Sequence, residues 1–239
     1  MTGWARKVFW KDVTTAAGPE GHAVLLDGRP LRTPARAALA LPTAALADLV
    51  AAEWRAQDGT IRPDSMPATR AANAAIDKVR GSKGDVTALV AAYGETDLLC
   101  YRASSPAALC AEQAAAWEPL LDWATRRYEV TWRRVEGVMP ASQPPATLAR
   151  LTNEVARLNA FELTAMHDLV AMSGSLVIGL AVLERAEAPE QLWQASRIDE
   201  DWQARQWGHD EEARRTAENR RQTFMQAVRF LRACQAEPG

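Results

Sequence analysis

Residues 196–213, with the sequence SRIDEDWQARQWGHDEEA, concentrate the side chains best suited to chemistry or recognition. Carboxylates outnumber arginines in this stretch, and Trp202 and Trp207 stand among them. Aromatic rings beside acids and amides are typical of protein-binding surfaces, because the rings supply contact area and the polar groups supply direction. The candidate partner-binding residues are Asp199, Glu200, Gln203, Trp207, Asp210 and Glu212.

Two other interpretations of this stretch remain open. The first is a solvated helix whose tryptophans point into the core, and the residue pattern alone favours it. In that case the acids pair with Arg214, Arg215 or Arg220 and only fix the last helices. The second is a small helical metal-dependent hydrolase, in which His209 and the acids after it bind the ion. Consecutive helical residues diverge by about 100°, however, so they cannot all converge on one ion.

Signatures of other enzyme classes are missing from the sequence. There is no glycine-rich phosphate loop and no G-x-S-x-G nucleophile motif. None of His22, His167 and His209 follows a glutamate three residues earlier, as a helical di-iron site would require. His167 lies in an apolar helix and is interpreted as a core histidine with a hydrogen-bond partner. From these residues we expect no cofactor and no metal site.

Composition limits which kinds of partner and which cellular compartment are expected. The 239 residues carry a formal net charge of -2, which gives no general attraction to nucleic acid or to an anionic membrane. Cys100, Cys110 and Cys234 lack the short spacings of a metal knuckle or a disulfide framework, which fits a reducing compartment. The most apolar run, residues 169–183, is shorter than the ~20 residues of a spanning helix. We expect a cytoplasmic monomer without membrane insertion.

The first 42 residues are predicted to be rich in β-structure. Residues 6–13 contain the β-branched and aromatic side chains typical of a strand, and residues 37–41 are a further candidate strand. A loop is expected at residues 17–21 because of its glycines and proline. Asp27-Gly28 between two short apolar runs predicts a β-hairpin, because its turn needs two residues with positive φ.

Helices are predicted to dominate the rest of the chain. Thr43 is the expected N-cap of the first helix. Ser105 is expected to cap a long helix with Pro106 at its first position, and Pro119 is expected to kink or split that helix. Residues 97–102 fit either a short extended piece or a helical turn. The other predicted helices cover residues 69–80, 85–93, 148–158, 159–183, 189–207 and 213–231.

The helix predicted over residues 159–183 is expected to be the central one. Asn159 and Glu162 fit a capping box, and the latter half of the segment is apolar almost all round. Gly174 and Gly179 would allow neighbouring helices to approach closely. The residues predicted to be buried in this helix are Leu169, Leu176, Val177 and Leu180.

The segment from Gly81 to Gly84 is the best candidate for a domain boundary. The pattern predicts an α+β fold, with a β-rich α+β N-terminal domain over residues 1–82 and a mainly α orthogonal helical bundle over residues 83–239. Residues 53–70 are interpreted as a tight connection between two helices, with the alternative that they help to seat a partner.

Short motifs in a fixed order, from about Arg6 to Leu231, are similar to those of one protein family. In the first half they include Phe9-Trp10-Lys11, Leu26-Asp27-Gly28-Arg29-Pro30-Leu31, Glu53-Trp54, Met66-Pro67, Asp97-Leu98-Leu99 and Gln113 with Trp117. In the second half they are Gly174-Ser175-Leu176, Asp199-Glu200, Gln203, Trp207-Gly208, Asp210 and Glu212-Ala213. On these residues the chain resembles the Atp-twelve family of F1-ATPase assembly chaperones, which attend the alpha subunit. Ala68 and Ala72 depart from it, standing where larger apolar residues are expected.

The resemblance implies a non-enzymatic function. Members of the family bind the free alpha subunit and shield its beta-facing surface, which is prone to aggregation, until the beta subunit displaces the chaperone. Such a binder must also release its partner, so we expect a polar, partly wet interface of moderate affinity. The acidic and aromatic residues from Asp199 to Glu212 suit that task. The resemblance also implies that bacterial members are cytoplasmic and that eukaryotic members lie in the mitochondrial matrix.

Overall fold

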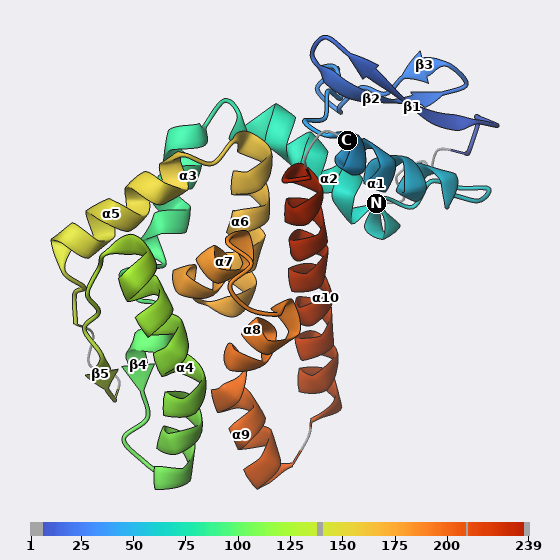
Figure 1. Cartoon of the computed structure of the whole chain (residues 1–239). Helices are drawn as coiled ribbons and strands as arrows, with labels where there is room; N and C mark the ends of the chain where they lie inside the picture. The colour runs from blue at the N-terminus through green and yellow to red at the C-terminus, as the bar shows by residue number, and fades with distance from the viewer. Residues whose placement is uncertain (1–6, 138–140, 209, 237–239) are drawn as a thin grey trace. The chain divides into compact units, whose positions relative to one another are not determined.

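The computed structural model describes residues 7–137, 141–208 and 210–236 (Figure 1). A small antiparallel sheet precedes a larger set of helices, which is the α+β fold that the sequence predicts. The chain divides into two compact units. The first unit holds the described residues up to Lys83, Asn159–Ala165 and the described residues from Arg229 onward, and the second unit holds the rest. The domain boundary near residue 82 stays a prediction, and two later segments belong to the first unit.

The first unit contains a three-stranded antiparallel sheet in the order β1-β2-β3. Asp27 and Gly28 have φ angles of 48° and 79°, so the predicted β-hairpin between β2 and β3 is confirmed. The Asp27 carboxylate accepts hydrogen bonds from the backbone N–H groups of Lys11 and Asp12, which lower the pKa of Asp27. The strands are β1 (Val13–Gly18), β2 (Gly21–Leu26) and β3 (Arg29–Pro30).

The other strand predictions for this region are wrong. The first strand begins at Val13, and Trp10 before it is buried instead, with its ring centroid 5.1 Å from that of Trp54. Residues 37–41 make only isolated bridges. The loop predicted over residues 17–21 includes the end of β1 and the first residue of β2, which are joined by a tight turn.

The first helix of the first unit begins where the sequence places it. The Thr43 hydroxyl accepts a hydrogen bond from the N–H of Leu46 at 3.1 Å, which confirms the predicted N-cap. The predicted helix over residues 69–80 begins earlier than expected and ends in a π-helical turn. The elements are α1 (Ala44–Arg55), η1 (Pro63–Ser65), α2 (Pro67–Ala74) and η2 (Ala75–Val79).

The second unit is built from helices and one short parallel pair of strands. Helix α7 packs against α4 and α8 within it, and α6 and α10 also contribute residues to the first unit. None of the described helices combines the length and the apolar run needed to cross a membrane. In chain order the elements are α3 (Lys83–Ala92), η3 (Leu98–Cys100), β4 (Tyr101–Arg102), α4 (Ala107–Tyr128), β5 (Val135–Glu136), α5 (Pro145–Ala156), α6 (Ala160–Ser173), α7 (Leu176–Leu183), α8 (Pro189–Ala195), α9 (Ile198–Trp207) and α10 (Glu211–Cys234).

Helix α7 is the most deeply buried helix of the second unit. Its residues from Leu176 to Val182 are all buried, among them the predicted core residues Leu176, Val177 and Leu180. Leu169 on α6 is buried as well, so all four predicted core residues are confirmed. The prediction of one helix over residues 159–183 is wrong. Gly174, with a φ of 73°, ends α6, because a left-handed residue cannot continue a right-handed helix.

The Asp97 side chain fixes the start of α7. It is fully buried and accepts hydrogen bonds from the Ser175 hydroxyl at 2.7 Å and from the N–H groups of Val177 and Leu99 at 2.9 and 3.0 Å. Burial raises the pKa of Asp97 to about 6, although these hydrogen bonds act in the opposite direction. Residues 97–102, for which two conformations were open, form η3 followed by β4.

Helix ends were predicted with mixed success. The capping box is confirmed, because Glu162 accepts from the N–H of Asn159 at 2.9 Å and Asn159 accepts from the N–H of Glu162 at 3.0 Å. Ser105 is not the cap of α4, since Pro106 occupies that position without a side-chain hydrogen bond. A split at Pro119 is also wrong. Helix α4 runs through Pro119 unbroken, and the exposed proline leaves only the carbonyl of Ala115 without its helical donor.

Candidate functional site

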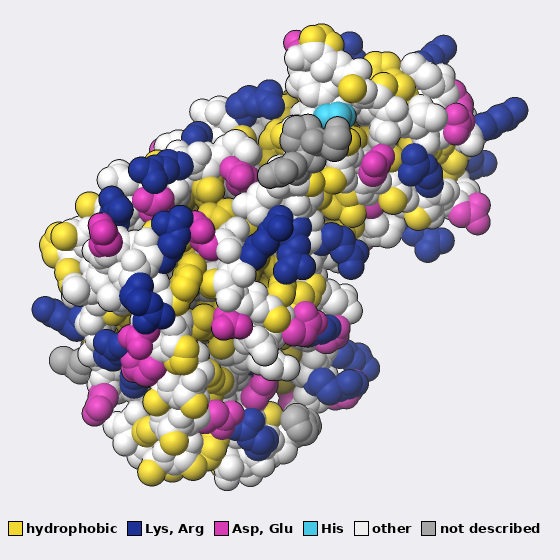
Figure 2. Space-filling view, viewed as in Figure 1, with side chains coloured by type: hydrophobic (Ala, Val, Ile, Leu, Met, Phe, Trp, Pro, Cys, Tyr) yellow, Lys and Arg dark blue, Asp and Glu magenta, His cyan; other side chains and the backbone are white. Residues whose placement is uncertain are grey.

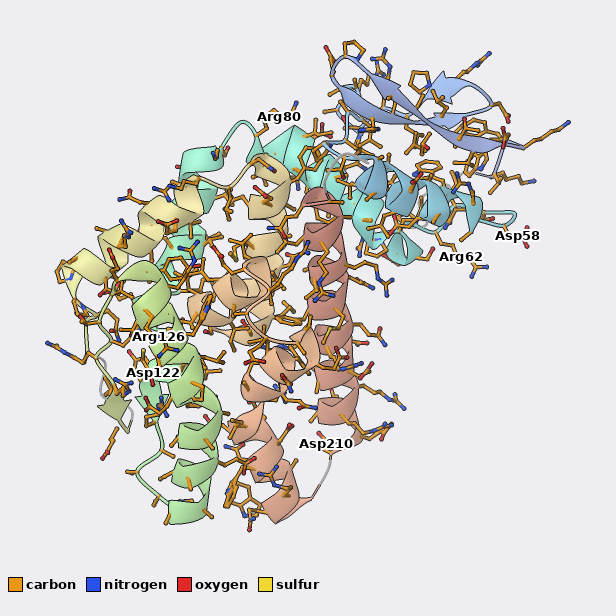
Figure 3. The ribbon with its side chains drawn as sticks, in the orientation of Figure 1. Asp58, Arg62, Arg80, Asp122, Arg126 and Asp210 are labelled. Carbon is orange, nitrogen blue, oxygen red and sulfur yellow. The ribbon has the colours of Figure 1, made fainter. Side chains whose placement is uncertain are left out.

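The candidate site lies on α9 and on the first turn of α10, both in the second unit. Ile198 is the only buried residue of α9, so most of this helix faces away from the core. The helix ends at Gly208, whose φ is 92°. Figure 3 places Asp210 at the connection to α10. The Asp210 carboxylate accepts a hydrogen bond from the N–H of Glu212 at 3.2 Å, which satisfies an otherwise unpaired donor at the helix start.

Asp199 points into the helical unit rather than into solvent. It is half-buried and accepts a hydrogen bond of 2.6 Å from the side-chain amide of Gln113 on α4. Gln113 is fully buried, and its carbonyl oxygen accepts from the N–H of Ala103 at 2.8 Å. Burial raises the pKa of Asp199. This chain of hydrogen bonds gives Asp199 a structural role in holding α9 against α4.

The other predicted site residues are exposed. Glu200 forms an ion pair with Arg197 at 2.7 Å. Gln203, Asp210 and Glu212 have no ion pair within the described ranges. Within the same ranges, no side-chain hydrogen bond joins Asp199 to these three residues, and only Asp210 and Glu212 are in contact through the cap. The structure therefore separates a structural carboxylate, Asp199, from exposed ones.

The arginines of α10 do not pair with the predicted site residues. Arg214 and Arg215 bind Glu211 at 2.9 and 3.2 Å, and Arg220 donates to the backbone carbonyl of Met172. In the part of the chain that the structure describes, Glu212 is thus left without a cationic partner. This placement removes the pairs that the purely structural interpretation of Glu212 requires.

The two tryptophans of α9 differ in exposure. Trp207 has 80% of its surface exposed, which makes it one of the most exposed large apolar residues described. Trp202 is half-buried, with the guanidinium of Arg205 5.4 Å from its ring centroid. Neither ring is in the core, as the interpretation of a solvated helix with inward tryptophans would require, because α9 buries only Ile198. Tryptophan is enriched among the residues that dominate protein–protein binding, so the exposed Trp207 fits a binding surface.

Charges of both signs cover the helical unit. Figure 2 shows acidic and basic side chains interspersed over the face in view, without a field of one sign. This agrees with the small net charge and with selective rather than general attraction. Electrostatic selectivity for a binding partner must therefore come from local clusters of charge.

Groups that bind metals or transfer protons are sparse. Within the described ranges, no cluster of three His, Cys, Asp or Glu side chains could hold a metal ion. His209, on which the hydrolase alternative depends, lies outside the described residues. His167 is half-exposed rather than core. It is 3.1 Å from Asp168, and this contact raises the pKa of His167.

The segment of residues 53–70 serves as a connection between helices, as the pattern indicates. The Glu53 carboxylate accepts from the N–H groups of Ala68 and Thr69 at 2.7 and 2.8 Å, where α2 begins. Gln57 accepts from the N–H of Arg62 at 2.7 Å, and Figure 3 shows Arg62 on this connection. Sequence reasoning found neither the Glu53 contacts, which span 15 and 16 residues, nor the local contact between Gln57 and Arg62.

Comparisons with known proteins point to one family. The family model described as ATP12 chaperone protein matches residues 7–125. The crystal structure of Atp12 from Paracoccus denitrificans is similar over 97% of this chain and 99% of that chain, with a TM-score of 0.93 and 46% sequence identity. An aspartate-to-lysine mutant of P. denitrificans Atp12p is similar over 96% of this chain and 98% of that chain, with a TM-score of 0.93 and 45% identity.

A eukaryotic relative is more distant. The mitochondrial protein atp12 of Schizosaccharomyces pombe is 25% identical over 217 residues, which cover 86% of this chain and 75% of that protein. The similarity to the P. denitrificans structures spans both compact units, including the acidic and aromatic helix α9.

Proposed function

The chain belongs to the ATP12 family of chaperones, which act in ATP synthase assembly, and from this membership we propose that it binds the free alpha subunit of the F1-ATPase. It covers the beta-facing surface of that subunit and suppresses aggregation until the beta subunit displaces it. The protein acts without catalysis, as a cytoplasmic monomer. The observation that carries the proposal is the similarity to Atp12 of P. denitrificans over 97% of this chain.

The exposed surface of α9 and α10 supports this function. Trp207 offers a large ring for anchoring, while Gln203, Asp210 and Glu212 offer polar groups that have no competing ion pairs in the described part. Charged groups raise the rate and selectivity of association, and a single exposed ring adds limited affinity. A chaperone needs this combination, because its partner must be released intact to the beta subunit.

A co-purification experiment tests the function. Alpha subunit expressed alone should aggregate, and co-expression with this chain should keep it soluble in a complex. Addition of purified beta subunit should then release the chaperone and yield an alpha–beta assembly. A soluble alpha subunit that never co-purifies with the chain, or a complex that beta cannot dissociate, would contradict the proposal.

A further inference from the structure

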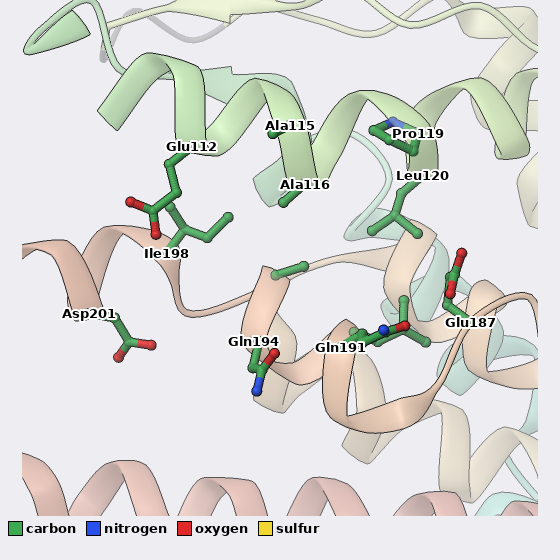
Figure 4. Close-up of a pocket in the computed structure, with 12 residues that line it drawn as sticks. Glu112, Ala115, Ala116, Pro119, Leu120, Glu187, Gln191, Gln194, Ile198 and Asp201 are labelled. Carbon is green, nitrogen blue, oxygen red and sulfur yellow. The ribbon is translucent and has the colours of Figure 1, made fainter. Parts of the chain in front are cut away.

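A groove of about 680 Å³ lies in the second unit, between α4 on one side and α8 with the start of α9 on the other (Figure 4). Its volume falls in the range of about 300–1,000 Å³ that is usual for concave binding sites. The α4 wall is made of small residues, Ala115, Ala116 and Pro119, which leave room for side chains of a partner. Buried apolar side chains underlie the groove, namely Leu120, Leu192, Ala195 and Ile198.

All the charged residues that line the groove are acidic. Glu112 is on α4, Glu187 is in the loop before α8 and Asp201 is on α9, and none of the described Lys, Arg or His residues lines the groove. Glu112 is paired with Arg205 at 2.6 Å. Glu187 and Asp201 are exposed and have no ion pair within the described ranges. Figure 4 shows Glu112 and Asp201 toward one end of the groove and Glu187 toward the other.

The α4 wall also presents a backbone hydrogen-bond acceptor that lacks its usual helical donor. Pro119 has no N–H, so the carbonyl of Ala115 lacks its usual donor within α4. Ala115 and Pro119 both line the groove and are exposed. A partner that brings donors can therefore satisfy this carbonyl as well as the carboxylates.

A second hollow, of about 430 Å³, differs from the groove because its lining indicates no preference for an acidic or a basic ligand. Acidic and basic side chains are mixed around it, so several of its charges are already balanced. It is lined by Trp193, Gln194, Arg197, Asp201, Arg214, Ala217, Glu218 and Arg221.

We propose that the groove between α4, α8 and α9 binds an apolar segment of the alpha subunit that carries arginine or lysine at its ends. This inference rests on the proposed function and extends the binding surface from α9 to α4 and α8. Apolar side chains of the segment displace water from the floor, and the basic ends pair with Glu187 and Asp201. An acidic segment is rejected, because it would face Glu187 and Asp201, which have no ion pair in the described part of the chain.

Two groove variants test the proposal. Ala115→Trp fills the groove from an exposed position of α4, and Glu187→Lys reverses an exposed charge that has no ion pair in the described part. The matched controls are Ala149→Trp on α5 and Glu95→Lys after α3, which are exposed and lie outside the groove. The Kd for purified alpha subunit is measured for all four full-length proteins, together with their melting temperatures.

Each groove variant should raise the Kd by roughly tenfold or more, while each control stays within about twofold of the unchanged chain. Unchanged binding by a folded Glu187→Lys protein overturns the groove proposal and leaves the proposed function intact. If the unchanged chain itself fails to bind alpha, the proposed function and the groove proposal both fall. If the groove variants alter only self-association of the chain, measured by sedimentation, the occupant is a second copy and the proposal is wrong.

Crosslinking identifies the occupant directly. Gln191 on α8 lines the groove but not the second hollow and is exposed, so p-benzoylphenylalanine in its place should crosslink to bound alpha subunit. Mass spectrometry should locate the crosslink in a segment with apolar residues flanked by arginine or lysine. A crosslink to an acidic segment, or no crosslink in a complex that still forms, would overturn the assignment.

Discussion

At the scale of single residues, the acids of α9 and α10 have different tasks. Asp199 is bound to buried Gln113, and Glu211 is paired with two arginines, so both carboxylates already have partners within the protein. Asp210 caps α10. Glu212 is exposed and has no ion pair in the described part, so it is the residue whose substitution best separates binding from folding.

We predict that Glu212→Lys leaves the protein folded and weakens capture of the alpha subunit. A surface substitution usually changes stability by about 0.5 kcal/mol or less, with a further cost of about 0.3–1 kcal/mol for a cation near a helix N-terminus. Binding should fall more steeply, because the reversed charge removes a contact and adds repulsion. Pull-down and thermal melting of the same preparation measure both effects, with Glu95→Lys as the control. Unaltered capture would remove Glu212 from the binding surface.

Asp97 predicts an unusual pH dependence of stability. Its folded pKa of about 6 lies above the ordinary value of 3.8, so the folded state binds the proton more tightly. Its contribution to stability is therefore fully present below pH 3.8 and is lost as pH rises through 6. Asp97→Asn removes this titration. The destabilisation by Asp97→Asn should consequently be larger at pH 5 than at pH 7.5, by about 1 kcal/mol.

Urea unfolding of both proteins at the two pH values measures this difference. A Ser175→Ala variant, which removes the hydroxyl donor but keeps the carboxyl group, serves as the control that retains the titration. A destabilisation by Asp97→Asn that is equal at both pH values would show that Asp97 has an ordinary pKa.

At the scale of elements, several local signals were predicted correctly, whereas contacts between distant residues were not. The Asp27-Gly28 turn, the Thr43 cap and the Asn159–Glu162 capping box each involve residues close in sequence. Strand β1 was missed because all its residues after Val13 are exposed, and its position is set by pairing with β2. The contact between Asp199 and Gln113 spans 86 residues and left no local pattern to find.

The two glycines that the sequence marks for close approach behave differently. Gly174 is required for its positive φ, whereas Gly179 is required for space between α7 and α6. A Cβ at Gly179 would lie 2.7 Å from the Met166 sulfur and 2.9 Å from a Val170 methyl group. Close packing at Gly179 therefore determines how α7 fits against α6.

We predict that Gly179→Ala destabilises the protein by about 1–3 kcal/mol, because overpacking outweighs the gain of about 1 kcal/mol in helix propensity. Val170→Ala should partly restore stability in the double variant. Gly84→Ala is the control, since a Cβ there meets nothing within 4 Å. Denaturant unfolding compares the variants, and a Gly179→Ala protein as stable as Gly84→Ala would contradict the close packing.

At the scale of the whole molecule, the compact units are not consecutive in sequence. The end of α10, from Arg229 on, belongs to the first unit together with the sheet and α1. The Thr43 hydroxyl links the end of α10 to α1 within this unit. It caps α1 and donates a hydrogen bond of 2.6 Å to the carbonyl of Ala233. If the units open separately, the end of α10 should open with α1 and not with α7.

Hydrogen exchange of the full-length protein tests this expectation. Thr43→Ala should cost about 0.5–2 kcal/mol through loss of the cap, and should speed exchange in α1 and at residues 230–234 while leaving α7 protected. Leu180→Ala, at a buried position of α7, should cost about 2–5 kcal/mol and speed exchange in α7 without affecting α1. The opposing patterns arise because each substitution lowers the opening free energy of its own unit. If either substitution raised exchange uniformly along the chain, the two units would open as one, and separate opening would be excluded.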